Sequence, residues 1–164
     1  MTYNFDTEVE VNFDFDVSSV YEQAVNAVLE YEKCPYEADV SLLITNDDSI
    51  REINKEMRGL DTATDVLSFP MSDYTNPADF SNIESDPDAF EPDSGELLLG
   101  DIVISLDKII SQADAFGHST KREFAFLIVH SMLHLIGFDH IEESDRAVME
   151  AHQKEIMNII NIPR

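Results

Sequence analysis

Three of the five histidines in this 164-residue chain fall within eleven residues, and their spacing constrains the fold more than any other feature. His130 and His134 lie four residues apart in a segment, residues 121–136, whose pattern predicts a helix. Residues at this separation share one helix face, with Cβ atoms about 5–6 Å apart, so both imidazoles can reach one metal ion. Gly137 can adopt the left-handed conformation that ends a helix, and the chain can then bring in His140 as a third ligand. Three protein ligands leave one tetrahedral position open, which is typical of a catalytic zinc.

The helix predicted around these histidines is apolar on nearly every side. Between Phe124 and Ile136 the only polar side chains are His130, Ser131 and His134. A helix of this kind is buried, and a buried imidazole is costly unless it has a partner. Core histidines bonded to backbone carbonyls are the alternative, but three at ligand spacing around a glycine favour a metal site.

The same spacing occurs in the metzincin signature, H-E-x-x-H-x-x-G-x-x-H, with one departure. The glutamate after the first histidine is the general base of those metalloproteases. Ser131 occupies that position here, and serine cannot do that work. The metal site therefore resembles a metalloprotease site, while the chemistry is expected to differ from proteolysis.

Composition predicts a single cytoplasmic domain spanning residues 1–164, long enough to bury a core. The lone Cys34 excludes an internal disulfide and fits a reducing compartment. No apolar run is long enough to cross a membrane, and the first residues do not resemble a secretory signal. The formal net charge of −24 repels nucleic acid at long range, so RNA would need a local basic cleft. The residues available to line one are Arg51, Lys55, Arg58, Lys121 and Arg122.

Hydrophobic periodicity predicts an α+β fold. The expected strands are residues 8–15, 38–45, 66–69 and 97–105, and the expected helices are residues 17–31, 47–57, 105–116, 121–136 and 143–160. Pro70 suggests that the third strand lies at a sheet edge. This order predicts a four-stranded mixed sheet packed by helices, with the zinc-binding helix buried at its centre in a zincin-like arrangement.

Two helices are assigned more specific features. Ile50, Ile53 and Met57 should form the buried stripe of the second helix, and Thr120 with Glu123 should form a capping box at the start of the histidine helix.

Residues 71–96 are predicted to be an acidic surface insertion. They contain eight aspartates and glutamates, no lysine or arginine, three prolines and little apolar periodicity. A long loop, at least partly disordered, is expected. Its role is open between a functional lid and a solvated insertion.

Three motifs in this order resemble the YbeY family of bacterial endoribonucleases. The motifs are Arg58 with residues 64–70 (TDVLSFP), residues 99–102 (LGDI), and residues 130–140 with the three histidines and Gly137. The resemblance covers most of the chain from about Ala38 onward. Ser131 departs from the glycine usual at its position, although both residues are small.

The resemblance implies one zinc per chain, held by His130, His134 and His140, and a catalytically important Arg58. It also implies single-strand-specific cleavage in the maturation of small-subunit rRNA 3′ ends, and a part in ribosome quality control. The implied partners are rRNA, the small ribosomal subunit and its associated factors. Neither DNA nor a membrane is expected as a partner.

Residue chemistry and resemblance agree on a mechanism. Zinc would polarise a phosphate oxygen or lower the pKa of bound water toward about 7. Arg58 would hold the phosphodiester through two parallel hydrogen bonds. The base is open among Asp139, His118 and a zinc-bound hydroxide, and Asp139 is at least as well suited to orienting a metal ligand.

Two other functions compete with the zinc endoribonuclease. One is a metzincin-like metalloprotease, which Ser131 disfavours. The other is a non-catalytic, zinc-containing ribosome assembly factor, which would not need Arg58 for its function.

Overall fold

A single sheet of four strands, in the order β1-β2-β4-β3, forms the centre of the computed structural model, which describes residues 1–164. The strands are β1 (Thr2–Thr7), β2 (Ala38–Thr45), β3 (Val66–Pro70) and β4 (Leu97–Ser105). β1, β2 and β4 run parallel, whereas β3 pairs antiparallel with β4 and leaves its other edge free. The predicted mixed, four-stranded sheet is confirmed, and so is the edge position of the third strand.

The first strand lies earlier in the chain than the alternation of residues 8–15 predicted. β1 pairs with β2 from Thr2 to Thr7, and the segment that follows has no strand partner. Its alternation is nevertheless real at the level of side chains, because Val9, Val11, Phe13 and Phe15 are all half-buried against the core. An extended segment that crosses a core has the same period of two as a strand, and only backbone pairing separates the two.

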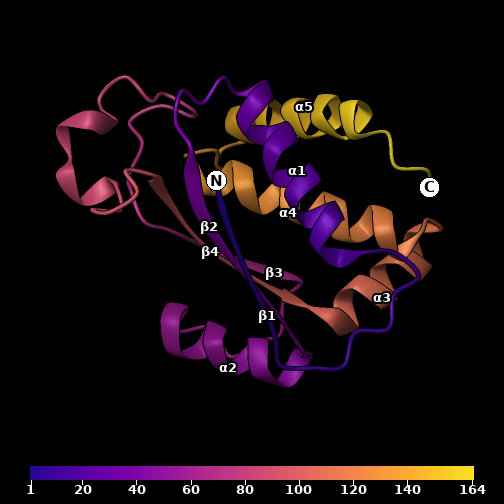
Figure 1. The fold of residues 1–164 in the computed structure, drawn as a ribbon. Helices are drawn as coiled ribbons and strands as arrows, with labels where there is room; N and C mark the ends of the chain where they lie inside the picture. The colour runs from indigo at the N-terminus through magenta and orange to yellow at the C-terminus, as the bar shows by residue number, and fades with distance from the viewer.

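Five helices cover the sheet unequally (Figure 1). They are α1 (Val17–Tyr31), α2 (Asp47–Arg58), α3 (Leu106–Phe116), α4 (Thr120–Leu135) and α5 (Glu143–Ile160). α2 lies alone on one face, while α1 and α4 pack on the other and α5 lies outside them. α4, which carries the first two histidines of the motif, is therefore enclosed by sheet and helices, as predicted.

Helix caps explain most of the element boundaries. The side chains of Asp16, Asn46 and Ser105 accept backbone N–H bonds at the starts of α1, α2 and α3. The predicted capping box of α4 is wrong: Ser119 is the cap, and the Glu123 carboxylate binds other side chains.

The buried stripe of α2 also differs from the prediction. Met57 is 65% exposed, and Asn54 is buried instead, with its amide donating to the Thr62 carbonyl. Asn54 lies one turn after the buried Ile50, so it shares that face of the helix.

The acidic segment 71–96 is more ordered than predicted. It forms two short 3₁₀ turns, Ile83–Ser85 and Pro87–Ala89, to one side of the sheet (Figure 1). Phe80, Ile83 and Ala89 are buried in the main core, a cluster of 33 residues. These apolar residues are spaced irregularly among carboxylates, so hydrophobic periodicity could not predict their burial.

Gly100 allows a close approach of two backbones within the sheet. Its φ is +133°, and a Cβ atom at this position would lie 2.1 Å from the carbonyl oxygen of Phe69 in β3. Any larger residue would push the edge strand away from the sheet. No helix of the structure is both long and apolar enough to traverse a bilayer.

Candidate active site and metal centre

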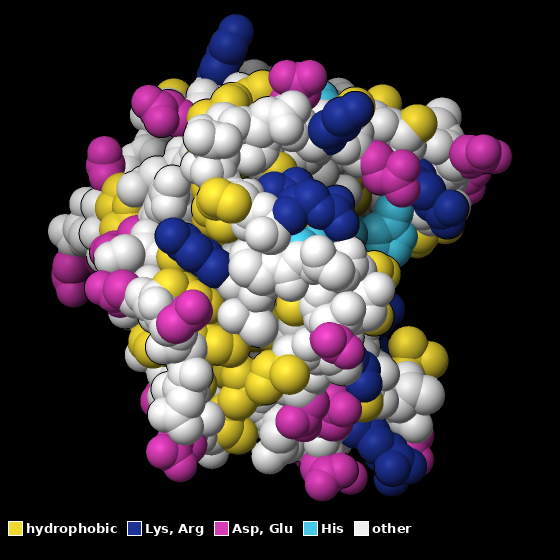
Figure 2. Space-filling model, turned by 90° about the vertical axis from the view of Figure 1, so that its right-hand side faces the viewer, with side chains coloured by type: hydrophobic (Ala, Val, Ile, Leu, Met, Phe, Trp, Pro, Cys, Tyr) yellow, Lys and Arg dark blue, Asp and Glu magenta, His cyan; other side chains and the backbone are white.

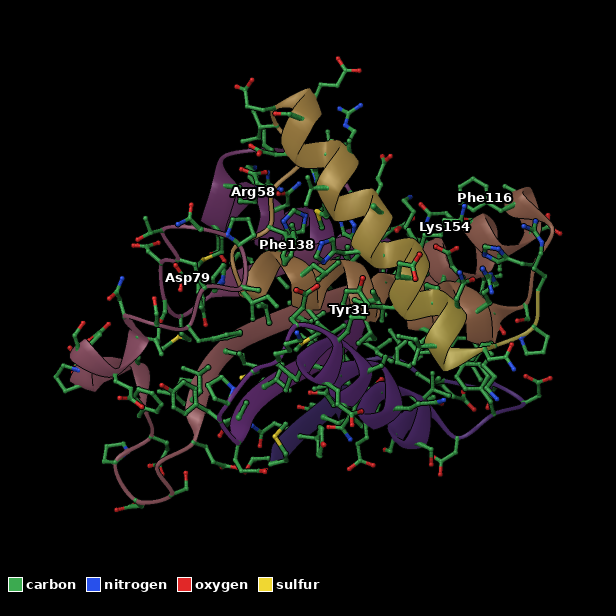
Figure 3. All side chains as sticks on the ribbon, turned by 90° about the horizontal axis from the view of Figure 1, so that it is seen from above. Tyr31, Arg58, Asp79, Phe116, Phe138 and Lys154 are labelled. Atoms are coloured by element: carbon green, nitrogen blue, oxygen red, sulfur yellow. The ribbon has the colours of Figure 1, made fainter.

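A cleft of about 580 Å³ opens along the edge strand β3, between the end of α2 and the end of α4. Arg58, the last residue of α2, lines one side of it, and His130 and His134 of α4 line the other together with residues 137–141. Figure 3 shows Arg58 on the same side of the molecule as Phe138 in the turn after α4. On the surface, histidine side chains lie beside a basic side chain (Figure 2). Segments far apart in sequence thus form one cleft.

The three histidines of the motif converge. One ring nitrogen from each of His130, His134 and His140 lies within 4.8 Å of the others. The Nε2 atoms of His130 and His134 are 3.2 Å apart. Two tetrahedral ligands at 2.0–2.1 Å from a zinc ion would lie about 3.3 Å apart, so this spacing fits a shared ion.

Both helical histidines have their second ring nitrogen occupied by a hydrogen-bond acceptor. Nδ1 of His134 donates to the carbonyl oxygen of Phe138 at 2.9 Å. Nδ1 of His130 donates to the side-chain oxygen of Gln153, which comes from α5. Because a neutral imidazole carries one proton, these bonds leave the lone pair on Nε2 of each ring, where the two rings face each other. This arrangement fits a metal, since neutral nitrogen donors are what zinc binds.

Burial keeps these imidazoles neutral. Loss of hydration lowers the pKa of His130, and it lowers the pKa of His134 to about 4, with the neighbouring His130 adding to the effect. His140 differs from both because its side chain is exposed. The site therefore combines two ligand candidates held on a rigid helix with a third on a loop.

Gly137 allows the turn that brings His140 back. Its φ is +103°, which favours glycine, and a Cβ atom there would lie 2.6 Å from the Cβ atom of Tyr74. The acidic segment packs against this turn, because the Ala78 amide also donates to the Ile136 carbonyl at 2.9 Å. The predicted left-handed glycine is confirmed, and its neighbour is the acidic segment itself.

Ser131, at the position of the metzincin glutamate, is turned away from base chemistry. It is fully buried, and its hydroxyl lies 2.6 Å from that of Ser68 in β3. The pair joins α4 to the edge strand that forms the floor of the cleft.

The other predicted site residues are only partly brought together. Asp139 lines the cleft, and one of its carboxylate oxygens accepts a hydrogen bond from the backbone N–H of His140. Its carboxylate forms no hydrogen bond with a histidine ring. His118 lies outside the cleft, at the start of α4, where it contacts Glu123 at 2.7 Å. Of the two side chains predicted as the base, only Asp139 therefore faces the site.

The predicted RNA-binding cations do not gather at the cleft, where Arg58 is the only lysine or arginine. Arg51 pairs with Asp61 at 2.8 Å, and Lys55 is exposed one turn before Arg58. Lys121 and Arg122 belong to the opposite end of α4, where Arg122 donates to the Ile162 carbonyl.

Two contacts of the site were missed from the sequence. Gln153 is a single polar residue within the buried stripe of α5, and a polar residue at such a position is a signal that could have been noticed. Ser68 lies within the motif of residues 64–70, but nothing in the motif indicated that its hydroxyl would contact Ser131.

Comparison with known proteins identifies the family. The family described as "Endoribonuclease YbeY" matches residues 2–161. Proteins named Endoribonuclease YbeY are similar over the full length of both chains, at 52% identity in Lachnoclostridium phytofermentans and 53% in Agathobacter rectalis. One from Clostridium botulinum is 39% identical, covering 98% of this chain and 97% of the relative. The solution structure of a Thermotoga maritima protein shares the fold, with a TM-score of 0.57 at 22% identity over 97% of this chain and 89% of the other. The chain therefore belongs to the YbeY family of endoribonucleases.

Proposed function

We propose that the whole chain acts as one zinc-dependent endoribonuclease domain that cleaves single-stranded RNA. The proposed substrate is the 3′ region of small-subunit rRNA, during its maturation and in ribosome quality control, with small-subunit factors as partners in the cytoplasm. The observation that carries the proposal is the convergence of three histidines and Arg58 in one cleft of a chain from this family.

His130, His134 and His140 would hold the ion in a zincin-like centre. A zinc ion bound there supplies a Lewis acid that stabilises negative charge on a phosphate oxygen. The neutral state of the two buried imidazoles supports this role, because protonated rings could not bind a cation.

Arg58 would bind the scissile phosphodiester. Its guanidinium forms no ion pair, so its donors are available to a ligand, unlike those of Arg51. A planar guanidinium can donate two parallel hydrogen bonds to two phosphate oxygens and stabilise the charge that builds up there. Asp139 is the side chain of this cleft that we assign as the candidate base.

Charge at the cleft explains why a divalent ion would matter for RNA binding as well. Arg58 lines the cleft together with Asp65, Asp73 and Asp139, so the lining has a formal charge of −2 with the histidines neutral. A divalent cation would neutralise this charge where the phosphate must approach. Arg51, Lys55, Lys121 and Arg122 remain predicted contacts for RNA beyond the cleft.

A metalloprotease is not proposed. Ser131 offers no carboxylate, and the family to which the chain belongs consists of endoribonucleases.

The decisive test is Arg58→Lys, which keeps the charge but removes the planar fork. Cleavage of a structured rRNA fragment with single-stranded 3′ ends should fall by about 10²–10³-fold, as when one preorganised donor is lost. Zinc content by metal analysis should be unchanged. RNA affinity, measured at the same fixed salt because phosphate contacts depend on salt, should fall much less than the rate.

Arg164→Lys is the matched control, since it makes the same substitution at an arginine that lies outside the cleft and is not among the predicted RNA contacts. If Arg58→Lys cleaves RNA at the wild-type rate, Arg58 has no catalytic role and is only a charged residue on the solvated face of α2. Binding without cleavage by the zinc-loaded wild type would favour the non-catalytic assembly factor.

A further inference from the structure

Gln153 is the only polar side chain on the buried face of α5. Its companions there are Met149, Ile156, Met157 and Ile160, and Gln153 itself is 7% exposed. Burying an amide among such neighbours is unfavourable unless its polar atoms find partners. The partner of its oxygen is Nδ1 of His130 on the facing helix α4.

This contact determines which nitrogen of His130 is free. A side-chain amide oxygen can only accept, so Nδ1 must carry the proton of the neutral ring. Nε2 then keeps its lone pair and faces Nε2 of His134 at 3.2 Å. In the other tautomer Nε2 would carry the proton and could not bind a cation.

The three histidines are anchored in different ways. His134 donates to a backbone carbonyl, that of Phe138, which no side-chain substitution removes. His140 is exposed, and no hydrogen bond holds its ring. Gln153 is therefore the one side chain whose identity directly controls a ring of the cluster.

We propose that Gln153 is a positioning residue that sets the metal affinity of the site by holding His130 with Nε2 free. The inference rests on the proposed metal centre. Residues that orient metal ligands in this way typically change metal affinity about 10- to 100-fold when they are replaced.

Replacing the neutral amide oxygen at position 153 by a charged acceptor should change zinc affinity in the opposite direction from removing the acceptor. A carboxylate accepts more strongly than an amide oxygen and increases the basicity of the histidine it holds. Gln153→Glu should therefore bind zinc at least as tightly as wild type. Gln153→Met keeps the length of the side chain but has no comparable acceptor, so it should bind zinc about 10- to 100-fold more weakly.

The first measurement is the affinity for Zn²⁺ alone, by competition with a chelating dye at about pH 7.5. Ile156→Val is the matched control, because it trims the same buried face of α5 without touching a histidine. Its zinc affinity should equal that of wild type. The ranking that supports the inference is Glu, then Gln, then Met at position 153.

The second measurement is the tautomer of His130 in the metal-free protein, read from the ¹⁵N shifts of its two ring nitrogens. Wild type should show the Nδ1–H form, and Gln153→Met should lose that preference. A general loss of packing, such as Ile156→Val causes, would leave the tautomer unchanged.

The outcomes separate this inference from the proposed function. A wild-type protein that binds no zinc would overturn the metal centre itself. If wild type binds zinc and a folded Gln153→Met variant matches it in affinity and tautomer, Gln153 only fills space. Should Gln153→Met fail to fold, Gln153→Glu decides: an affinity below that of wild type would overturn the inference.

Discussion

The two ends of α4 each carry a histidine bonded to a buried side chain, yet only one end faces a cleft. At the start of the helix, His118 contacts the carboxylate of Glu123, which also accepts from Gln112. At the other end, His130 and His134 are held by neutral oxygens, those of Gln153 and Phe138.

The difference lies in the charge and number of the partners. At the start of the helix the Glu123 carboxylate binds the His118 ring outside the cleft, which makes a structural contact. At the other end burial keeps the rings uncharged, the neutral acceptors on Nδ1 leave the lone pair of Nε2 free, and a third histidine converges on the same point. Proximity to a polar partner is thus not enough to make a metal site; the partner must leave a nitrogen available.

The largest expected effect comes from removing one ligand at the cleft end. His134→Ala should lose most bound zinc and lower RNA cleavage by at least about 10²–10³-fold, because the site then has two ligands instead of three. Metal analysis and a cleavage assay check this. His118→Ala is the comparison, and it should retain full zinc. Zinc loss in the His118 variant, or full occupancy in the His134 variant, would break the contrast between the two ends.

A smaller effect should appear in the pH dependence of stability. The pKa of His134 is about 4 in the folded protein, below its ordinary value of 6.5, so the unfolded chain binds a proton first as pH falls. The metal-free protein should therefore lose stability between about pH 6.5 and 4, by up to about 3 kcal/mol from this group.

Denaturant unfolding of the metal-free protein at several pH values measures this loss. The control is His134→Gln, which cannot charge and should lose less stability over the same range. Parallel pH profiles for the two proteins would show that burial does not control the charge of His134.

The smallest effect is expected at the other end of α4. Glu123→Met removes the acceptor shared by His118 and Gln112; Gln112 keeps Asp65 as an acceptor, but the half-buried His118 ring loses its partner, which should cost about 1–3 kcal/mol of unfolding free energy. Zinc affinity should not change, because neither partner lines the cleft. Thermal unfolding and zinc titration on the same sample test both halves, and altered zinc affinity would mean that the two ends are coupled through the helix.

Sequence patterns predicted most of the fold because the elements carry their own boundary signals. Asp16 and Asn46 cap the starts of α1 and α2, and Gly59 and Gly117 end α2 and α3 in left-handed conformations. The errors arose where a local pattern had two explanations. The alternation after Thr7 suited a strand as well as an extended segment over the core, and Ser119 and Thr120 were both suitable caps.

The acidic segment shows a different limit. Its composition predicted an exposed, charged loop, but Phe80 and Ile83 are buried in a core made of residues distant in sequence. Isolated apolar residues carry no period, so only the packed structure reveals that they belong to the core.

The sequence by itself determined the metal-ligand candidates, because helical geometry places residues four apart on one face and a glycine allows the chain to return. It also determined the family, through motifs whose order and spacing are local properties of the chain. The tertiary structure alone decided that Arg58 reaches the histidine cleft while His118, Lys121 and Arg122 do not, and that Gln153 holds His130. The reason is physical: the relative positions of α2, α4 and α5 depend on how each helix packs on or over the sheet, and no local periodicity encodes which side chains then meet.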